Sequence, residues 1–177
     1  MIHLILGGRR SGKTRFAEQL AHNSAKQVHY IATALVFDTE MGQRAKAHQA
    51  ERPPTWYTHE TPFELAKVLA QFRDDNHCLL VDCLTMWVTN MLCADYTPEQ
   101  IAAERKALID VIQSSRATII FVSNETGLGI VPEGALTRRY CDEAGILHQE
   151  IAALADHAAL IVAGLPLTLK NAAATGT

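Results

Sequence analysis

Gly7-Gly8-Arg9-Arg10-Ser11-Gly12-Lys13-Thr14 is a complete G-x-x-x-x-G-K-T phosphate-binding loop. The loop follows an apolar run, Ile2–Leu6, that is typical of a buried strand, and it precedes a helical pattern that begins near Lys13. Strand, glycine-bearing loop and helix are the context that this motif requires. The stretch therefore predicts a nucleoside triphosphate site, against the alternative of a simple glycine-rich turn.

Each part of this loop has a chemical role in binding a triphosphate. Its glycines let backbone N–H groups surround the α- and β-phosphates, while Lys13 reaches the β- and γ-phosphates and the hydroxyl of Thr14 is a ligand for Mg²⁺. The amino-terminal end of the following helix adds partial positive charge. Arg9, Arg10 and Arg15 gather more positive charge at the same point. We expect the whole loop to contact the nucleotide.

The composition of the 177-residue chain is that of an ordinary globular protein, with 48% hydrophobic and 20% charged residues. We expect a single domain over residues 1–170 and a flexible tail over residues 171–177. A formal net charge of −3 disfavours a nucleic-acid partner. The apolar stretches are too short to span a bilayer, and Met1 leads directly into a strand, so we expect no membrane insertion and a cytoplasmic location.

The four cysteines, Cys78, Cys83, Cys93 and Cys141, form no C-x-x-C pair. Their spacing disfavours both a zinc site and a disulfide framework. We expect them to be small core hydrophobes in a reducing compartment.

Short apolar runs alternate with helical patterns along the chain, which predicts an α/β fold with a mostly parallel central sheet. Helices are expected to begin at Thr61 and at Thr97, because each starts a capping-box pattern with proline in the first helical position. A long helix is expected over Ala135–Asp156, broken near Gly145. Ligands should bind at the carboxyl ends of the strands. The expected strands are Ile2–Leu6, Val28–Ala32, Cys78–Asp82, Thr118–Ser123 and Ala158–Ala163.

Phosphate-loop proteins commonly use a second acidic group, at the end of another core strand, to hold Mg²⁺. Asp82 ends the third expected strand and would act opposite Thr14. The alternative is an aspartate that caps the next helix at Leu84. Asn124 and Glu125 follow the fourth expected strand, where they would bind a substrate hydroxyl or a coordinated water, or form only a polar turn.

The segment Asp38–Pro53 distinguishes this chain from a plain kinase. It is predicted to be one helix that stops before its final proline, with Arg44, His48 and Arg52 at spacings of four on one face. The two arginines would neutralise a phosphate and favour the neutral imidazole, which is a competent nucleophile at physiological pH. The alternative is a surface histidine on a basic helix.

Several further motifs accompany the phosphate loop almost to the end of the chain. They are Tyr30-Ile31-Ala32-Thr33-Ala34, the segment Arg44–Pro53 with Trp56, Asp82-Cys83-Leu84-Thr85 with Thr89-Asn90, Val122-Ser123-Asn124-Glu125, Gly129-Ile130-Val131-Pro132-Glu133 and Ala163-Gly164-Leu165-Pro166. With these motifs the chain resembles the bifunctional adenosylcobinamide kinase / adenosylcobinamide-phosphate guanylyltransferase family of cobalamin biosynthesis. The combination is far more specific than the loop alone.

The resemblance implies a RecA-like P-loop fold, a homotrimer and one site that runs two reactions on a corrinoid. Adenosylcobinamide would be phosphorylated with ATP or GTP, and GMP would then pass from GTP to adenosylcobinamide phosphate through a covalent intermediate on His48. The product would be adenosylcobinamide-GDP. Mg²⁺ would be held by Thr14 and Asp82. The nucleotide contacts that the resemblance implies are Gly7, Gly8, Arg9, Arg10, Ser11, Gly12, Lys13, Thr14, Ala32, Thr33, Ala34, Gln49, Ala50, Glu51, Arg52, Glu60 and Asp82.

Two positions depart from the family pattern. His148-Gln149 stands where Asn-Gln is common, and Arg9-Arg10 stands where Ala-Arg is frequent; neither change removes a catalytic group. A carboxylate such as Glu60, accepting from guanine N1 and N2, would explain a preference for GTP. From the residues alone, two other functions stay open: a small-molecule kinase without nucleotidyl transfer, and a RecA-type nucleotide-binding switch or assembly subunit.

Overall fold

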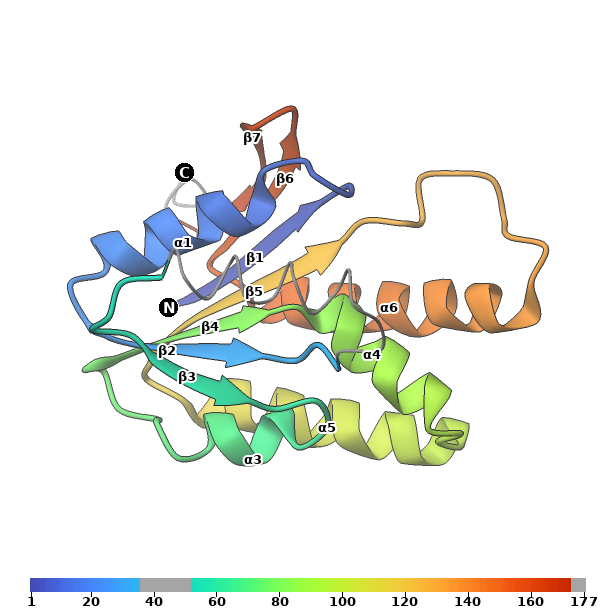
Figure 1. The fold of residues 1–177 in the computed structure, drawn as a ribbon, viewed down its shortest axis with the longest axis horizontal. Helices are drawn as coiled ribbons and strands as arrows, with labels where there is room; N and C mark the ends of the chain where they lie inside the picture. Colours follow the sequence, from blue (N-terminus) through green and yellow to red (C-terminus); the bar gives the residue numbers. More distant parts are fainter. Residues whose placement is uncertain (36–51, 173–177) are drawn as a thin grey trace.

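The computed structural model describes residues 1–35 and 52–172, which form a seven-stranded sheet with helices on both faces (Figure 1). The strand order is β3-β2-β4-β5-β1-β6-β7; β7 is antiparallel to β6, and the other neighbouring strands are parallel. In chain order the elements are β1 (Ile2–Gly7), α1 (Lys13–Asn23), β2 (Gln27–Ala32), β3 (Tyr57–Glu60), α3 (Leu65–Leu69), β4 (His77–Asp82), α4 (Leu84–Cys93), α5 (Pro98–Ser114), β5 (Thr118–Asn124), α6 (Ala135–Leu154), β6 (His157–Val162) and β7 (Leu165–Asn171).

Both faces of the sheet are buried, which explains the continuous apolar runs of its central strands. Along β4, Leu79 and Val81 pack into the layer beneath α3, α4, α5 and α6, while Cys78 and Leu80 pack into the layer beneath α1. All the strands expected from apolar runs are present, and each end lies within one residue of its predicted position. The α/β fold class and the mostly parallel sheet are confirmed.

The strands β3 and β7 were not predicted, because they lie at the two edges of the sheet. Most of their side chains are exposed, so neither strand contains a buried apolar run. Asn171, expected to begin a flexible tail, is the last residue of β7 and pairs with His157. Residues 173–177 lie outside the described residues.

One predicted helix start is confirmed and one is wrong. The Thr97 hydroxyl accepts a bond from Gln100 N at 3.3 Å, and the Gln100 side chain accepts one from Thr97 N at 2.8 Å, which completes the capping box of α5. By contrast, α3 begins only at Leu65. The backbone N–H of Thr61 is bonded to Ala32 O at 2.7 Å, so it continues the pairing with β2 instead of starting a helix.

Two further expectations need correction. The helix α6 runs unbroken through Gly145, because Ala144 and Leu147 anchor that turn in the core. Among the cysteines, all of which are free thiols, Cys78 is buried as expected, but Cys93 at the end of α4 is exposed. No helix in the described part of the chain is both long enough and apolar enough to cross a membrane.

Candidate active site

The phosphate loop joins β1 to α1 at the carboxyl end of the sheet (Figure 1). Close packing at this point requires its glycines. A Cβ atom on Gly7 would lie 2.5 Å from Ser11 Oγ and 2.7 Å from Ile161 O. Gly12 has a φ of 94°, and a Cβ there would lie 3.3 Å from the Cα of Gly164. Gly164 also donates its backbone N–H to Ser11 O at 2.8 Å. The turn between β6 and β7 therefore supports the loop from behind, a role that the sequence alone did not reveal.

Lys13 begins α1, so its ammonium group lies beside the positive end of the helix dipole. Its Nζ donates to Gly8 O at 3.1 Å and thus reaches back across the loop. Burial lowers the pKa of Lys13 from its usual value, while Cys83 and Asp82 act in the opposite direction. Lys13 therefore lies within electrostatic range of Asp82 at the end of β4.

The surface of the loop is suited to an anion. Gly8, Arg9 and Arg10 are exposed, so their N–H groups and guanidinium groups can reach a ligand. Ser11 Oγ is buried and has no hydrogen-bond partner among the described residues. Exposed cations around an unsatisfied polar atom at a helix N-terminus fit a phosphate chain.

Three of the predicted contact residues lie side by side at the carboxyl ends of β3, β2 and β4. In register, Ala32 is paired with Glu60 on one side and with Asp82 on the other. Ala34, just beyond β2, is exposed. Thr33 has a different role, because its hydroxyl donates to Cys83 O at 2.6 Å and accepts from Cys83 N at 2.8 Å. Its fully buried side chain fastens the end of β2 to the start of α4.

Asp82 is held by Tyr30, which was not among the predicted site residues. The Tyr30 hydroxyl donates to Asp82 Oδ2 at 2.5 Å from the neighbouring strand β2. Burial and the nearby carboxylate of Asp82 raise the pKa of Tyr30 far above its usual value, so the hydroxyl keeps its proton. The alternative role for Asp82 is not seen, since the N-cap of α4 is Cys83 and makes no side-chain cap bond.

Arg52 lies against the same tyrosine. Its guanidinium carbon is 3.5 Å from the centroid of the Tyr30 ring, and its Nη1 is 3.4 Å from Thr58 Oγ1 on β3. The other residues predicted from this segment, His48, Gln49, Ala50 and Glu51, lie outside the described residues. Arg52 is therefore the described end of the segment that carries the predicted nucleophile.

The end of β5 brings Asn124 and Glu125 beside the loop. Asn124 pairs with Gly7, and Glu125 N donates to Gly7 O at 3.1 Å. The Glu125 carboxylate also accepts from Gly127 N at 2.5 Å, so the predicted polar turn is present. Thr85 Oγ1 accepts from Asn124 N at 2.7 Å and ties this turn to α4.

The departure at His148 extends this network. His148 Nε2 lies 2.8 Å from the hydroxyl of Ser123, and that hydroxyl lies 3.3 Å from Thr85 Oγ1. Burial lowers the pKa of His148, and the carboxylate of Glu125 acts against this shift. An unprotonated Nε2 accepts a hydrogen bond from the Ser123 hydroxyl, so the imidazole completes a chain of hydroxyl groups that leads to Asn124.

The donor atoms at this site suit Mg²⁺ held together with a nucleotide. Asp82 and Thr14 supply a carboxylate and a hydroxyl, the hard oxygen ligands that Mg²⁺ prefers. Within residues 1–35 and 52–172, no group of three or more His, Cys, Asp or Glu side chains is arranged to hold a metal by itself. Mg²⁺ commonly uses one or two protein ligands, with phosphates and water completing its shell.

A phosphate loop after the first strand, an acid at the end of β4 and a mostly parallel sheet define a RecA-like P-loop nucleotide-binding protein. The structure is similar to the RadB recombinase, with a TM-score of 0.52 and 17% identity over 90% of this chain and 73% of that chain. It is also similar to the flagellar accessory protein FlaH from Methanocaldococcus jannaschii, with a TM-score of 0.51 and 16% identity over 99% and 80% of the two chains. At these identities the likeness establishes the fold alone.

Sequence comparison narrows the class. Residues 3–169 match the family described as cobinamide kinase / cobinamide phosphate guanyltransferase, and the chain belongs to this family. It is 52% identical to the bifunctional adenosylcobalamin biosynthesis protein CobP of Pseudomonas aeruginosa, over 97% of this chain and 98% of that protein. It is 38% identical to CobU of Escherichia coli K12, which has the same description, over 96% and 100% of the two chains. The predicted family resemblance is thereby confirmed.

Proposed function

We propose that this protein phosphorylates adenosylcobinamide with ATP or GTP and then transfers GMP from GTP to the new phosphate, giving adenosylcobinamide-GDP. The observation that carries this proposal is a complete phosphate loop facing Asp82 in a chain whose residues 3–169 match the kinase/guanyltransferase family. Both reactions use one nucleotide site. The corrinoid is a small-molecule partner, and no nucleic acid takes part.

In the kinase reaction, the loop amides and Lys13 stabilise the charge on the transferring γ-phosphoryl group. Thr14 and Asp82 would hold Mg²⁺, which neutralises the β- and γ-phosphates when it is bound. The substrate hydroxyl oxygen bonds to the γ-phosphorus as the bond to the β–γ bridging oxygen breaks; the nucleoside diphosphate leaves and the hydroxyl proton passes to water. We assign Asn124 and Glu125 to the substrate hydroxyl, because both follow β5 directly beside the loop.

In the guanylyltransferase reaction, the neutral imidazole of His48 attacks the α-phosphorus of GTP, and pyrophosphate leaves. A phosphate oxygen of the substrate then displaces GMP from the histidine. Arg52 neutralises the phosphates, and Gln49, Ala50 and Glu51 contact the nucleotide with it. Glu60 is the last residue of β3 and is exposed, so its carboxylate is suited to accept hydrogen bonds from guanine N1 and N2.

We further propose that the protein is cytoplasmic and assembles as a homotrimer. The family resemblance supports the trimer, and so do exposed apolar side chains that a second copy could cover. Leu165, Leu167 and Leu169 alternate along the edge strand β7 and are 71%, 57% and 55% exposed.

The deciding experiment is the intact mass of the protein after incubation with GTP and Mg²⁺. We expect wild type to gain the mass of GMP in an acid-labile linkage, and His48→Ala to gain none. His22→Ala, which changes an exposed histidine on α1, is the matched control and should still form the adduct. Wild type that binds GTP but forms no adduct would point instead to a kinase without nucleotidyl transfer.

A further inference from the structure

Tyr30 contacts two residues that the proposed function assigns to different reactions. We infer that it is a positioning residue that couples the kinase centre to the guanylyl-transfer segment, holding Asp82 with its hydroxyl and Arg52 with its ring. This inference rests on the proposed function and deepens it. Tyr30 is not expected to touch the reacting atoms, since only 2% of its surface is exposed.

The hydroxyl contact fixes one carboxylate orientation. Tyr30 and Asp82 are on adjacent strands, and their 2.5 Å bond joins residues 52 apart in the sequence. A tyrosine hydroxyl donates one hydrogen bond, so Asp82 Oδ2 has a partner in the core. The carboxylate is thereby presented to the phosphate loop in a single rotamer, which a metal ligand in a catalytic site requires.

The ring contact orients a guanidinium group. Arg52 stacks on the ring of Tyr30, with 3.5 Å between the guanidinium carbon and the ring centroid. Its Nε is buried and has no hydrogen-bond partner among the described residues, so the ring face is the main feature that sets its plane. A planar cation on an aromatic face keeps N–H groups free at its edge for phosphate oxygens.

The two contacts together explain how one site can serve two phosphorus atoms. Asp82 acts near the γ-phosphate, whereas Arg52 is four residues from His48 in the sequence and acts near the α-phosphate. Because both are held by one rigid side chain, their relative position is set by the core and not by the nucleotide. Loss of the hydroxyl and loss of the ring should therefore have different consequences.

The test compares Tyr30→Phe with Tyr30→Leu. Tyr30→Phe keeps the ring and loses the bond to Asp82, so its kinase rate should fall about tenfold while GMP-adduct formation falls much less. Tyr30→Leu loses both contacts, and both rates should fall by about tenfold or more. Tyr57→Phe, on the exposed edge strand β3, is the matched control and should change neither rate.

A readout independent of turnover uses Mn²⁺ as the probe ion. Its binding to the enzyme with a non-hydrolysable GTP analogue, followed by electron paramagnetic resonance, should weaken several-fold in Tyr30→Phe. Thermal melting of each variant reports any simple loss of folding. Unchanged Mn²⁺ binding, or a fall of both rates in the same proportion in Tyr30→Phe, would overturn the inference.

The ring contact can be tested from its exposed side if Tyr30→Leu does not fold. Arg52→Met removes the cation without altering the core, and adduct formation should slow. Because Tyr30→Phe keeps the ring, the double variant Tyr30→Phe/Arg52→Met should form the adduct about as slowly as Arg52→Met alone. Adduct formation that Arg52→Met leaves unchanged, or a further large loss in the double variant, would contradict the separate roles of ring and hydroxyl. If wild type forms no adduct at all, the proposed function fails, whereas Mn²⁺ binding by Tyr30→Phe still tests the hold on Asp82.

Discussion

The strands β2, β3 and β4 carry two sets of polar side chains that differ in their partners. At the carboxyl end, which we call the open end, the register brings Glu60, Ala32 and Asp82 together beside the phosphate loop. The second set, which we call the closed end, consists of His77 and His29 nearer the amino ends of their strands and His59 directly before Glu60, and His29 bonds to both other imidazoles. The first set is available to a ligand, whereas the second uses its polar groups internally.

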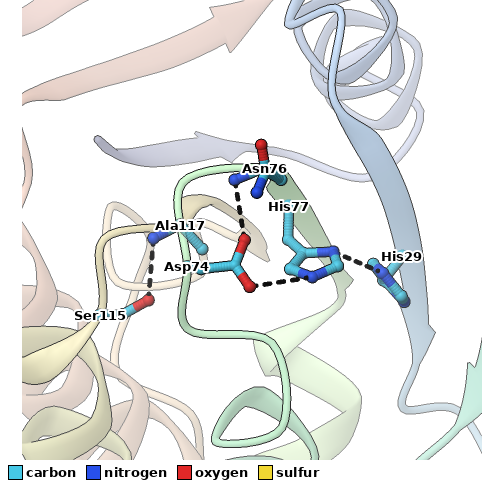
Figure 2. A network of polar contacts seen from close by, with 6 residues as sticks. All are labelled: His29, Asp74, Asn76, His77, Ser115 and Ala117. Carbon is cyan, nitrogen blue, oxygen red and sulfur yellow. Dashed lines mark hydrogen bonds and ion pairs between the residues drawn. The ribbon is translucent and has the colours of Figure 1, made fainter.

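The imidazole nitrogens of these histidines are bonded to one another and to Asp74. His29 is 3.0 Å from His59 Nε2 and 3.1 Å from His77 Nδ1, and His77 Nε2 is 3.4 Å from Asp74 Oδ2. Figure 2 shows His29, His77 and Asp74 joined in this order. Phe72 stacks on His29 with 3.9 Å between ring centroids. In this sheet, therefore, the groups available to a ligand and the groups that support the structure form two separate sets of side chains.

The largest effect should come from removing the cation of the phosphate loop. Lys13→Met deletes the ammonium group that faces the β- and γ-phosphates, and we expect the kinase rate to fall by about 10³-fold. Because the side chain is only partly buried, the melting temperature should stay close to that of wild type. Steady-state kinetics and thermal melting measure the two quantities. A variant with near-normal turnover would show that the open end is not the catalytic end.

The sequence predicted the open end better than the closed one, for a physical reason. The phosphate loop is contiguous, so its glycines, Lys13 and Thr14 are visible as one motif. The histidine chain joins residues 30 and 48 positions apart, and only strand pairing brings them together. Tyr30 was missed as a site residue on the same ground, since its partner Asp82 is on another strand.

The secondary-structure elements also divide into those that the sequence predicted and those that it did not. Central strands are buried on both faces and leave apolar runs, whereas β3 and β7 at the edges do not. Thr61 was misread because its capping pattern is local, while its N–H is used by β2 in the folded chain. The predicted helix around His48 lies outside the described residues, so the role of that histidine remains a prediction.

An intermediate effect should appear at the closed end as acid lability. Burial and the neighbouring imidazoles of His77 and His59 lower the pKa of His29 from 6.5 to about 4. Between these values the unfolded chain binds a proton that the folded chain excludes, so the free energy of unfolding falls as pH drops from about 6.5 to about 4. Above that window the group contributes no pH dependence. We expect these histidines to lower the free energy of unfolding by about 1–3 kcal/mol over this pH range.

Urea unfolding at pH 7.5, 6.0 and 5.0 measures this effect. His29→Phe keeps a ring on Phe72 but removes the excluded proton, so its stability should fall less steeply with acid than that of wild type. His22→Ala, an exposed histidine on α1, should fall as steeply as wild type. At pH 7.5 the folded His29→Phe protein should keep its kinase rate, because the closed end does not contact the nucleotide. Parallel stability curves for His29→Phe and wild type would contradict the assignment.

The smallest effect should come from His148, a largely buried histidine that lies near the open end. In the tautomer that leaves Nε2 unprotonated, the imidazole accepts a hydrogen bond from Ser123, and the hydroxyl chain through Thr85 contacts Asn124 beside the loop. Tyr140 of α6 and Cys83 also lie on this side, but burial raises the pKa of each, so Glu125 is the charged group that acts on the imidazole among the described residues. Protonation of Nε2 would reverse the Ser123 bond.

His148→Asn replaces this acceptor with an amide oxygen that does not titrate, and asparagine is the residue that the family resemblance led us to expect here. One exchanged hydrogen bond is worth about 1 kcal/mol, so the kinase rate at pH 7.5 should change by less than about fivefold. Because burial lowers the pKa of His148, the wild-type rate should decline only below pH 6.5, and this decline should be shallower in His148→Asn. Gln149→Asn, at the exposed neighbouring position, is the control. If the kinase rate falls equally at low pH in wild type and in His148→Asn, His148 has only a packing role. The division between groups that serve the reaction and groups that support the structure would then be sharper than we infer.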